Sequence, residues 1–124
     1  MTGEGRHLRG VGPQAVVTMP AEIDVTNADE IRQALIAAAS HDATVLIIDM
    51  GGTTFCDSAG VQAIIDVRNQ TAATRTQLRL VATAVLRILT LVGIDQLIPI
   101  YPTLEAALAG ASSAQATRDG NDPA

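Results

Sequence analysis

LIIDMGGTTFCDSAGV, residues 46–61, is the stretch of sequence that decides the fold of this 124-residue chain. It starts inside a predicted strand, Thr44–Asp49, whose continuous apolar run is typical of a central strand covered on both faces of a sheet. The pair Gly51-Gly52 then indicates a turn out of that strand. From Ser58 to about Ala72 the apolar residues recur at helical spacing. The stretch therefore predicts a buried strand, a loop and a helix in direct succession.

Upstream of this stretch, the sequence predicts two strands and a helix. The strands are expected at Leu8–Val11 and Gln14–Met19, and Gly12-Pro13 between them is a turn signal that favours a hairpin. A helix is expected over Thr26–Ser40, because Thr26 to Asp29 fits a capping box and the apolar residues that follow fall on one face.

Downstream, the strand-and-helix alternation continues to residue 110. Gly93 follows an apolar helical segment where a left-handed residue would end a helix, and Gly110 stops the last one. The expected elements are, in order, a strand at Leu78–Ala82, a helix with Thr83 as its N-cap, a short strand at Leu97–Tyr101 bent by Pro99, and a helix at Thr103–Ala109.

Alternating strands and helices predict an α/β domain with a mixed, mostly parallel sheet. We expect about four to five strands packed with about four helices, in one domain that suits the chain length. The expected boundaries are a flexible N-terminus over residues 1–7, the domain over 8–110, and a disordered tail over 111–124, where Ser, Ala, Gln, Asp and Pro accumulate.

Composition excludes several classes of function. The net charge is -5, and the eight basic residues are all arginine, so there is no clustered basic surface for nucleic acid. No apolar run approaches the roughly 20 residues that span a bilayer, and the N-terminal residues show no signal peptide. Cys56 is the single cysteine, which fits a reducing compartment. We therefore expect a cytoplasmic protein with no membrane or nucleic-acid partner.

The sequence offers little for catalysis, metal or cofactor binding. His7 and His41 lie far apart in the sequence and only one cysteine is present, so neither a metal site nor a cofactor is expected. Ser58 does not fit the nucleophile elbow of hydrolases, because Cys56 stands where that motif needs glycine. Apolar neighbours and Asp57 should raise the pKa of the Cys56 thiol, which indicates a structural cysteine. We expect a non-enzymatic protein.

Ser58 has an ordinary structural explanation as well as a functional one. Serine is a favoured N-cap, where its hydroxyl accepts a hydrogen bond from a helix N–H group. Asp57 before it would be stabilised by the helix dipole. From the residues alone, the position of Ser58 is compatible with a helix cap and with an exposed functional serine.

Four segments resemble the STAS domain family in matching order and spacing. Phe55 to Val61, after the strand ending at Asp49, resembles the family motif F-x-D-S-[SA]-G-[LV], and Glu22-Ile23-Asp24 resembles its G-E-L-D turn. The segment 86–94 resembles the stretch that ends the family's third helix, and 103–108 resembles its final helix. There are two departures: Ala21 stands where the family has glycine, and Arg87 is the only basic residue of the third helix.

The resemblance implies an anti-sigma-factor antagonist. In such proteins the motif serine is phosphorylated by an anti-sigma-factor serine kinase, the unphosphorylated form binds that kinase and releases a sigma factor, and a phosphatase resets the serine. Carried over, Ser58 is the phosphorylation site, with Thr53 and Thr54 as weaker candidates, and the family resemblance favours a monomer. The expected partner-binding residues are Asp24, Thr54, Asp57, Ser58, Ala59 and Gly60.

Other functions remain open at this point. STAS domains also serve as scaffolds in stress-signalling complexes and as regulatory tails of anion transporters. A nucleotide-binding or small-molecule-sensing module is the alternative from another class, although the chain has no phosphate loop and only two aromatic residues, Phe55 and Tyr101.

Overall fold

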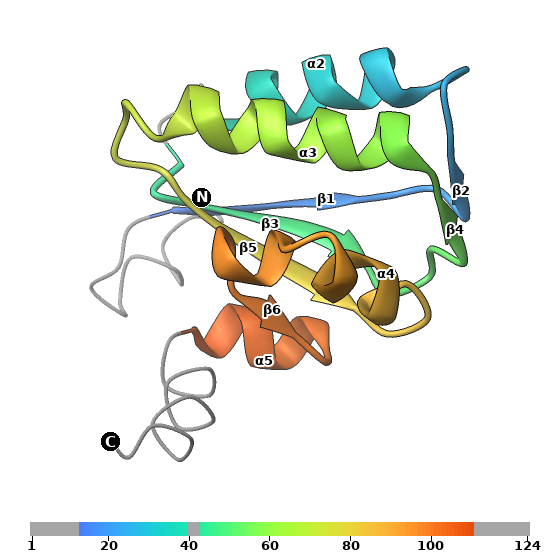
Figure 1. Cartoon of the computed structure of the whole chain (residues 1–124). Helices are drawn as coiled ribbons and strands as arrows, with labels where there is room; N and C mark the ends of the chain where they lie inside the picture. The colour runs from blue at the N-terminus through green and yellow to red at the C-terminus, as the bar shows by residue number, and fades with distance from the viewer. Residues whose placement is uncertain (1–12, 40–42, 111–124) are drawn as a thin grey trace.

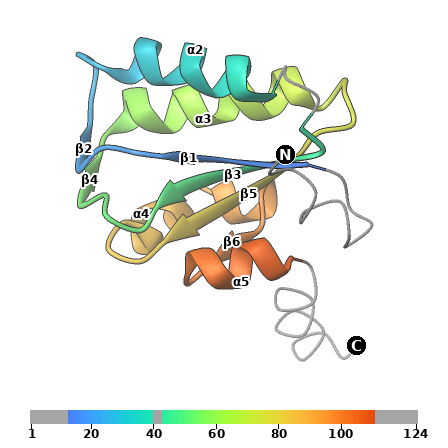
Figure 2. The ribbon, with the colours of Figure 1, turned by 180° about the vertical axis from the view of Figure 1, so that it is seen from behind.

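A computed structural model describes residues 13–39 and 43–110 (Figures 1 and 2). Within them, four strands form one sheet in the order β1 (Gln14–Thr18), β3 (Val45–Met50), β5 (Gln77–Ala82) and β6 (Ile100–Tyr101). Every pairing in this sheet is parallel. Two short strands, β2 (Glu22–Ile23) and β4 (Phe55–Cys56), form a separate parallel pair.

Helices lie on both faces of the sheet. Two parallel-running helices, α2 (Ala28–Ala39) and α3 (Ser58–Thr71), cover one face, and α5 (Leu104–Ala109) covers the other (Figure 1). Between β5 and β6 the chain forms α4 (Leu86–Leu91) and a short 3-10 helix, η1 (Ile94–Gln96). This arrangement confirms the predicted single α/β domain with a mostly parallel sheet and four α-helices in the described residues.

The apolar run in β3 is buried because both faces of the sheet are covered. Successive side chains of a strand point to opposite faces. Leu46, Ile48 and Met50 therefore join the main core under α2 and α3, whereas Val45 and Ile47 join the smaller core under α5. The continuous hydrophobic stretch predicted for a central strand is thus confirmed.

Three expectations at the N-terminal half need correction or fall outside the described residues. Leu8–Val11 is not described, so the expected hairpin is untested, but Gln14–Thr18 pairs in parallel with β3. The first helix begins at Ala28 rather than Thr26. The Thr26 hydroxyl donates to the Asp24 carboxylate instead of forming the predicted capping box.

The third helix and the last strand are shorter than predicted. Thr83 is not the N-cap of α4, because its hydroxyl donates to the Gly51 carbonyl at 3.3 Å and the helix begins at Leu86 without a side-chain cap. Gly93 has the predicted left-handed conformation, with φ of 86°. Beyond it the chain forms η1, so only Ile100–Tyr101 remains in the sheet.

No helix in the described part of the chain is long and apolar enough to cross a membrane. In the same residues, His, Cys, Asp and Glu side chains form no group of three or more that could hold a metal ion.

Candidate functional site

The candidate site is built from two chain segments that are more than thirty residues apart in sequence. The β2–β4 pair holds them together, with Glu22 opposite Phe55 and Ile23 opposite Cys56. The Asp57 amide donates to the Ile23 carbonyl at 3.1 Å, which extends the pairing to the start of α3. Asp24 and Asp57 therefore follow the last paired residues on adjacent segments.

Hydrogen bonds of Thr53 and Thr54 hold the loop before β4 in place. The Thr53 hydroxyl donates to the Pro20 carbonyl at 2.8 Å and is completely buried. The Thr54 amide and hydroxyl both lie near the Ala21 carbonyl, at 2.8 and 3.3 Å. Thr53, named above as a weaker phosphorylation candidate, is therefore closed to any enzyme while the domain is folded, whereas Thr54 is exposed.

Asp57, and not Ser58, caps helix α3. The Asp57 carboxylate accepts from the backbone amides of Ala59 at 2.9 Å and Gly60 at 3.1 Å. The backbone of Asp57 is extended, with φ of -93°, as an N-cap requires. The interpretation of Ser58 as the cap is therefore wrong, because the carboxylate one residue earlier already satisfies the amides that a cap would bind.

Ser58 is consequently left with an unused hydroxyl on the surface. It is the first residue of α3 and it is exposed. Its hydroxyl has no hydrogen-bond partner among the residues that the structure describes. Adding a group to this oxygen would break no bond of the fold.

Gly60 shapes the site from inside the molecule. A Cβ atom at this position would lie 2.6 Å from Cγ2 of Ile23 and 2.7 Å from Sγ of Cys56. Real Cβ atoms essentially never approach other heavy atoms so closely, so glycine permits the first turn of α3 to rest directly on β2 and β4. Gly60 is buried, whereas Ala59 beside it is half-buried.

Asp24 organises the turn between β2 and α2. Its carboxylate accepts from the Thr26 hydroxyl at 2.5 Å and the Thr26 amide at 2.9 Å, and these bonds hold the pKa of the carboxyl below its usual value. Its own amide donates to the Asn27 side chain, which in turn donates to the Glu22 carbonyl. Asp24 thus stays ionised near neutral pH, and it directly follows the strand that pairs with β4.

Cys56 is buried beneath the loop. Burial, with a smaller contribution from the Asp57 carboxylate, raises the pKa of its thiol to about 11. The predicted rise in the pKa of this thiol therefore has the two causes that the sequence indicated, and the side chain is buried.

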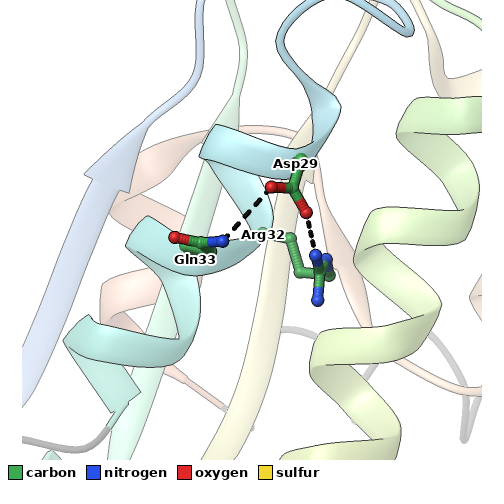
Figure 3. Close-up of polar contacts among 3 residues, drawn as sticks. All are labelled: Asp29, Arg32 and Gln33. Atoms are coloured by element: carbon green, nitrogen blue, oxygen red, sulfur yellow. Dashed lines mark hydrogen bonds and ion pairs between the residues drawn. The ribbon is translucent and has the colours of Figure 1, made fainter.

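One positive charge near the site, that of Arg32, is paired within its own helix. Arg32 and Asp29 line the hollow between α2 and α3 together with Ala59. Asp29 accepts from Arg32 and from Gln33 on the same helix, so the Arg32 guanidinium is paired within α2 (Figure 3). The i,i+3 spacing of Asp29 and Arg32 in a predicted helix is the sequence signal for this pair. The ring of Phe55 is 50% exposed, whereas Cys56, its neighbour in the same two-residue strand, is buried.

Comparison with known proteins agrees with the family resemblance. The STAS domain family model matches residues 6–107. An anti-sigma factor antagonist from Mycobacterium paratuberculosis is similar in structure, with a TM-score of 0.72 and 30% sequence identity over 80% of this chain and 86% of that chain. No curated protein matches the sequence.

Two further solved structures share the fold. A sulfate transporter family protein from Wolinella succinogenes has a TM-score of 0.70 at 17% identity, covering 83% of this chain and 88% of that chain. The anti-sigma factor antagonist SpoIIAA, in its unphosphorylated form, has a TM-score of 0.64 at 20% identity, covering 77% and 85%. With the family match spanning most of the chain and the motif segments assembled around Ser58, this protein belongs to the STAS domain family.

Proposed function

We propose that this protein is an anti-sigma-factor antagonist of a partner-switching pathway. The unphosphorylated form binds an anti-sigma-factor serine kinase, which releases a sigma factor, and phosphorylation of Ser58 blocks that binding. The observation that carries the proposal is the separation of roles between two neighbours: Asp57 caps α3, and the hydroxyl of Ser58 is exposed and unbonded.

This separation suits a reversible modification. If Ser58 were the cap, phosphorylation would alter the group that binds the first amides of α3, and so the start of the helix itself. Because Asp57 provides the cap, both forms of the protein keep the same helix start. The switch then acts on the partner and not on the fold, and a phosphatase restores the original surface.

The electrostatics support a switch that works by charge. Phosphoserine carries roughly −1.5 to −2 charges near neutral pH. Asp57 is next to Ser58 in sequence, and Asp24 lies on the adjacent segment, so the phosphate would add to a negative surface. Burying an unpaired anion at an interface costs several kcal/mol, and about 4 kcal/mol corresponds to roughly a thousandfold loss of affinity.

The proposal also assigns the remaining roles. Asp24, Thr54, Asp57, Ser58 and Ala59 form the exposed or half-exposed part of the kinase-binding surface, and Gly60 supports it from within. The domain acts as a monomer in the cytoplasm, where transcription takes place, and it performs no chemistry of its own.

Phosphorylation by the kinase is the decisive test. The purified protein is incubated with ATP and each candidate anti-sigma-factor kinase of its own genome, and the phosphate is located by mass spectrometry. We expect one phosphate on Ser58 and none in Ser58→Ala. Absence of phosphate with every kinase would contradict the proposal and favour a scaffold or a ligand-sensing module.

A further inference from the structure

One arginine lies in the hollow between α2 and α3. The hollow holds about 260 Å³, and among the described residues that line it Arg32 is the only basic one. Asp29 and Asp66 line it as well, and Ala59 contributes from the first turn of α3. Figure 3 shows the Arg32 side chain extending from α2 towards α3. A guanidinium group is therefore held between the two helices, close to the residue that follows Ser58.

Ser58 lies at the N-terminal edge of this hollow. Side chains four residues apart share one face of a helix, so Ser58 stands one turn before Gln62, which lines the hollow. Helices α2 and α3 both begin at this end of the domain (Figure 1). A group added to the Ser58 oxygen would thus project beside the first turn of α2, where Arg32 meets Asp29.

Asp29 binds Arg32 only weakly. It forms the one ion pair of this arginine within residues 13–39 and 43–110, and it lies three residues earlier on the same helix. The side chains of Arg32 and Asp29 are 34% and 68% exposed, and exposed ion pairs within a helix contribute little to stability. Asp29 also accepts from Gln33, so it keeps a hydrogen bond when the arginine leaves.

A phosphate on Ser58 would be a stronger partner for Arg32. Phosphoserine carries roughly −1.5 to −2 charges and three acceptor oxygens, whereas a carboxylate carries one charge. The planar guanidinium matches the geometry of phosphate oxygens and binds two of them at once. The acidic side chains on the neighbouring segments cannot neutralise the phosphate; they are Asp24, Asp57 and Asp66.

We propose that Arg32 exchanges Asp29 for the phosphate when Ser58 is phosphorylated, so that the modification changes the surface of α2 as well as that of α3. The inference rests on the proposed function, because it needs a phosphate on Ser58. Phosphorylation then leaves the Asp29 carboxylate without its arginine on the first turn of α2. One guanidinium charge does not neutralise the phosphate fully, so a net negative charge stays at Ser58 and the proposed block of kinase binding is kept.

The test measures the pKa of the phosphate on Ser58 by phosphorus-31 NMR in the full-length protein. Phosphoserine is inserted at this position during translation, so no kinase is needed. The second pKa of phosphoserine is ordinarily about 6, and an ion pair with Arg32 lowers it because the pair favours the dianion. Arg32→Gln removes the pair and should raise this pKa by about 0.2–0.7 units, which corresponds to the strength of exposed ion pairs. Arg32→Lys keeps the charge without the planar fork and should restore part of the lowering.

Arg68→Gln is the matched control, because it removes the same charge from a different place. Arg68 lies in the last turn of α3, about 15 Å from Ser58 along the helix axis. Charges that far apart are largely screened at about 0.1 M salt, where the Debye length is about 10 Å. The pKa of the phosphate should therefore move by less than about 0.1 units in this variant. Circular dichroism of each variant checks that the fold is kept.

Each outcome has a separate meaning. A rise of the phosphate pKa in Arg32→Gln alone supports the exchange. Equal pKa values in wild type, Arg32→Gln and Arg68→Gln would overturn the exchange and leave the proposed function standing, because that function needs the phosphate and not its partner. Equal rises in both variants would also overturn it, since the phosphate would then respond to net charge alone. Failure of every kinase to phosphorylate Ser58 would overturn the proposed function and, with it, the role of this exchange in a switch.

Discussion

Replacing Gly60 by alanine adds one methyl group at the tightest contact of the site. The new Cβ would lie 2.6 Å from Cγ2 of Ile23 and 2.7 Å from Sγ of Cys56, and both neighbours are buried. Neither contact involves the far end of a flexible side chain, so α3 must move away from β2 and β4. Overpacking of a core costs about 1–3 kcal/mol. Alanine offsets up to about 1 kcal/mol of this cost, because its helix propensity is higher than that of glycine. Because contacts of 2.6 and 2.7 Å place the overpacking cost in the upper part of that range, at about 2–3 kcal/mol, we expect a net loss of about 1–2 kcal/mol.

Urea denaturation followed by circular dichroism measures this loss, because the chain lacks tryptophan. Gly52→Ala is the matched control: a Cβ there meets nothing within 4 Å, so its stability should change little. Adding Cys56→Ala to Gly60→Ala removes the sulfur contact, and the two changes together should cost less than the sum of their separate effects. A Gly60→Ala protein as stable as wild type would refute the close packing of α3 on the β2–β4 pair.

Three further predictions follow from other contacts. Asp57→Ala should destabilise the domain by about 1 kcal/mol, because the cap of α3 is lost. Ser58→Ala should change the free energy of unfolding by less than about 0.5 kcal/mol. Equal effects of the two variants in thermal melts would contradict the assignment of the cap. The pKa of the Cys56 thiol is raised in the folded state, so the neutral thiol stabilises the domain fully below pH 9. As the pH rises towards 11, the free energy of unfolding should fall by up to about 2 kcal/mol because of this group. Urea titrations at pH 8 and 10.5 measure the fall, and Cys56→Ala should lack the part that comes from the thiol. Gly110→Ala should destabilise the domain by about 1–3 kcal/mol, because a φ of 85° is strained for alanine and the new Cβ would lie 3.1 Å from the Arg79 guanidinium. That guanidinium donates to the Ala107 carbonyl at 2.8 Å. A variant that melts like wild type would show that the position of Arg79 does not depend on this glycine.

The position of the cap decides how the proposed switch can work. A carboxylate cap already places a negative charge at the start of α3, and the helix dipole favours it there. Phosphate on Ser58 would share that dipole with Asp57, so the net change in folding free energy should be small. The phosphate should have its large effect on the binding free energy at an interface, because the added charge is desolvated there.

Local sequence determined the elements that have strong periodic or apolar signals. The run before Asp49 gave a central strand because alternate side chains enter two cores, and this follows from strand geometry alone. Helix α3 and the left-handed Gly93 were likewise predictable, since their signals lie within a few residues of one another. The order of motif segments was enough to predict the family.

Tertiary structure decided which side chain does what at the site. Serine and aspartate are both good N-caps, and only the register of the β2–β4 pair with α3 places the Asp57 carboxylate over the free amides. Threonine is also a favoured N-cap, but the hydroxyl of Thr83 donates to the carbonyl of Gly51, 32 residues earlier. The exposed apolar side of α4 is also invisible to periodicity, because a six-residue helix with apolar residues on several sides does not reveal which side meets the core. Several groups distant in sequence could bind the same hydroxyl or amide, and only tertiary packing decides which of them does. The surface around Ser58 therefore depends on tertiary packing.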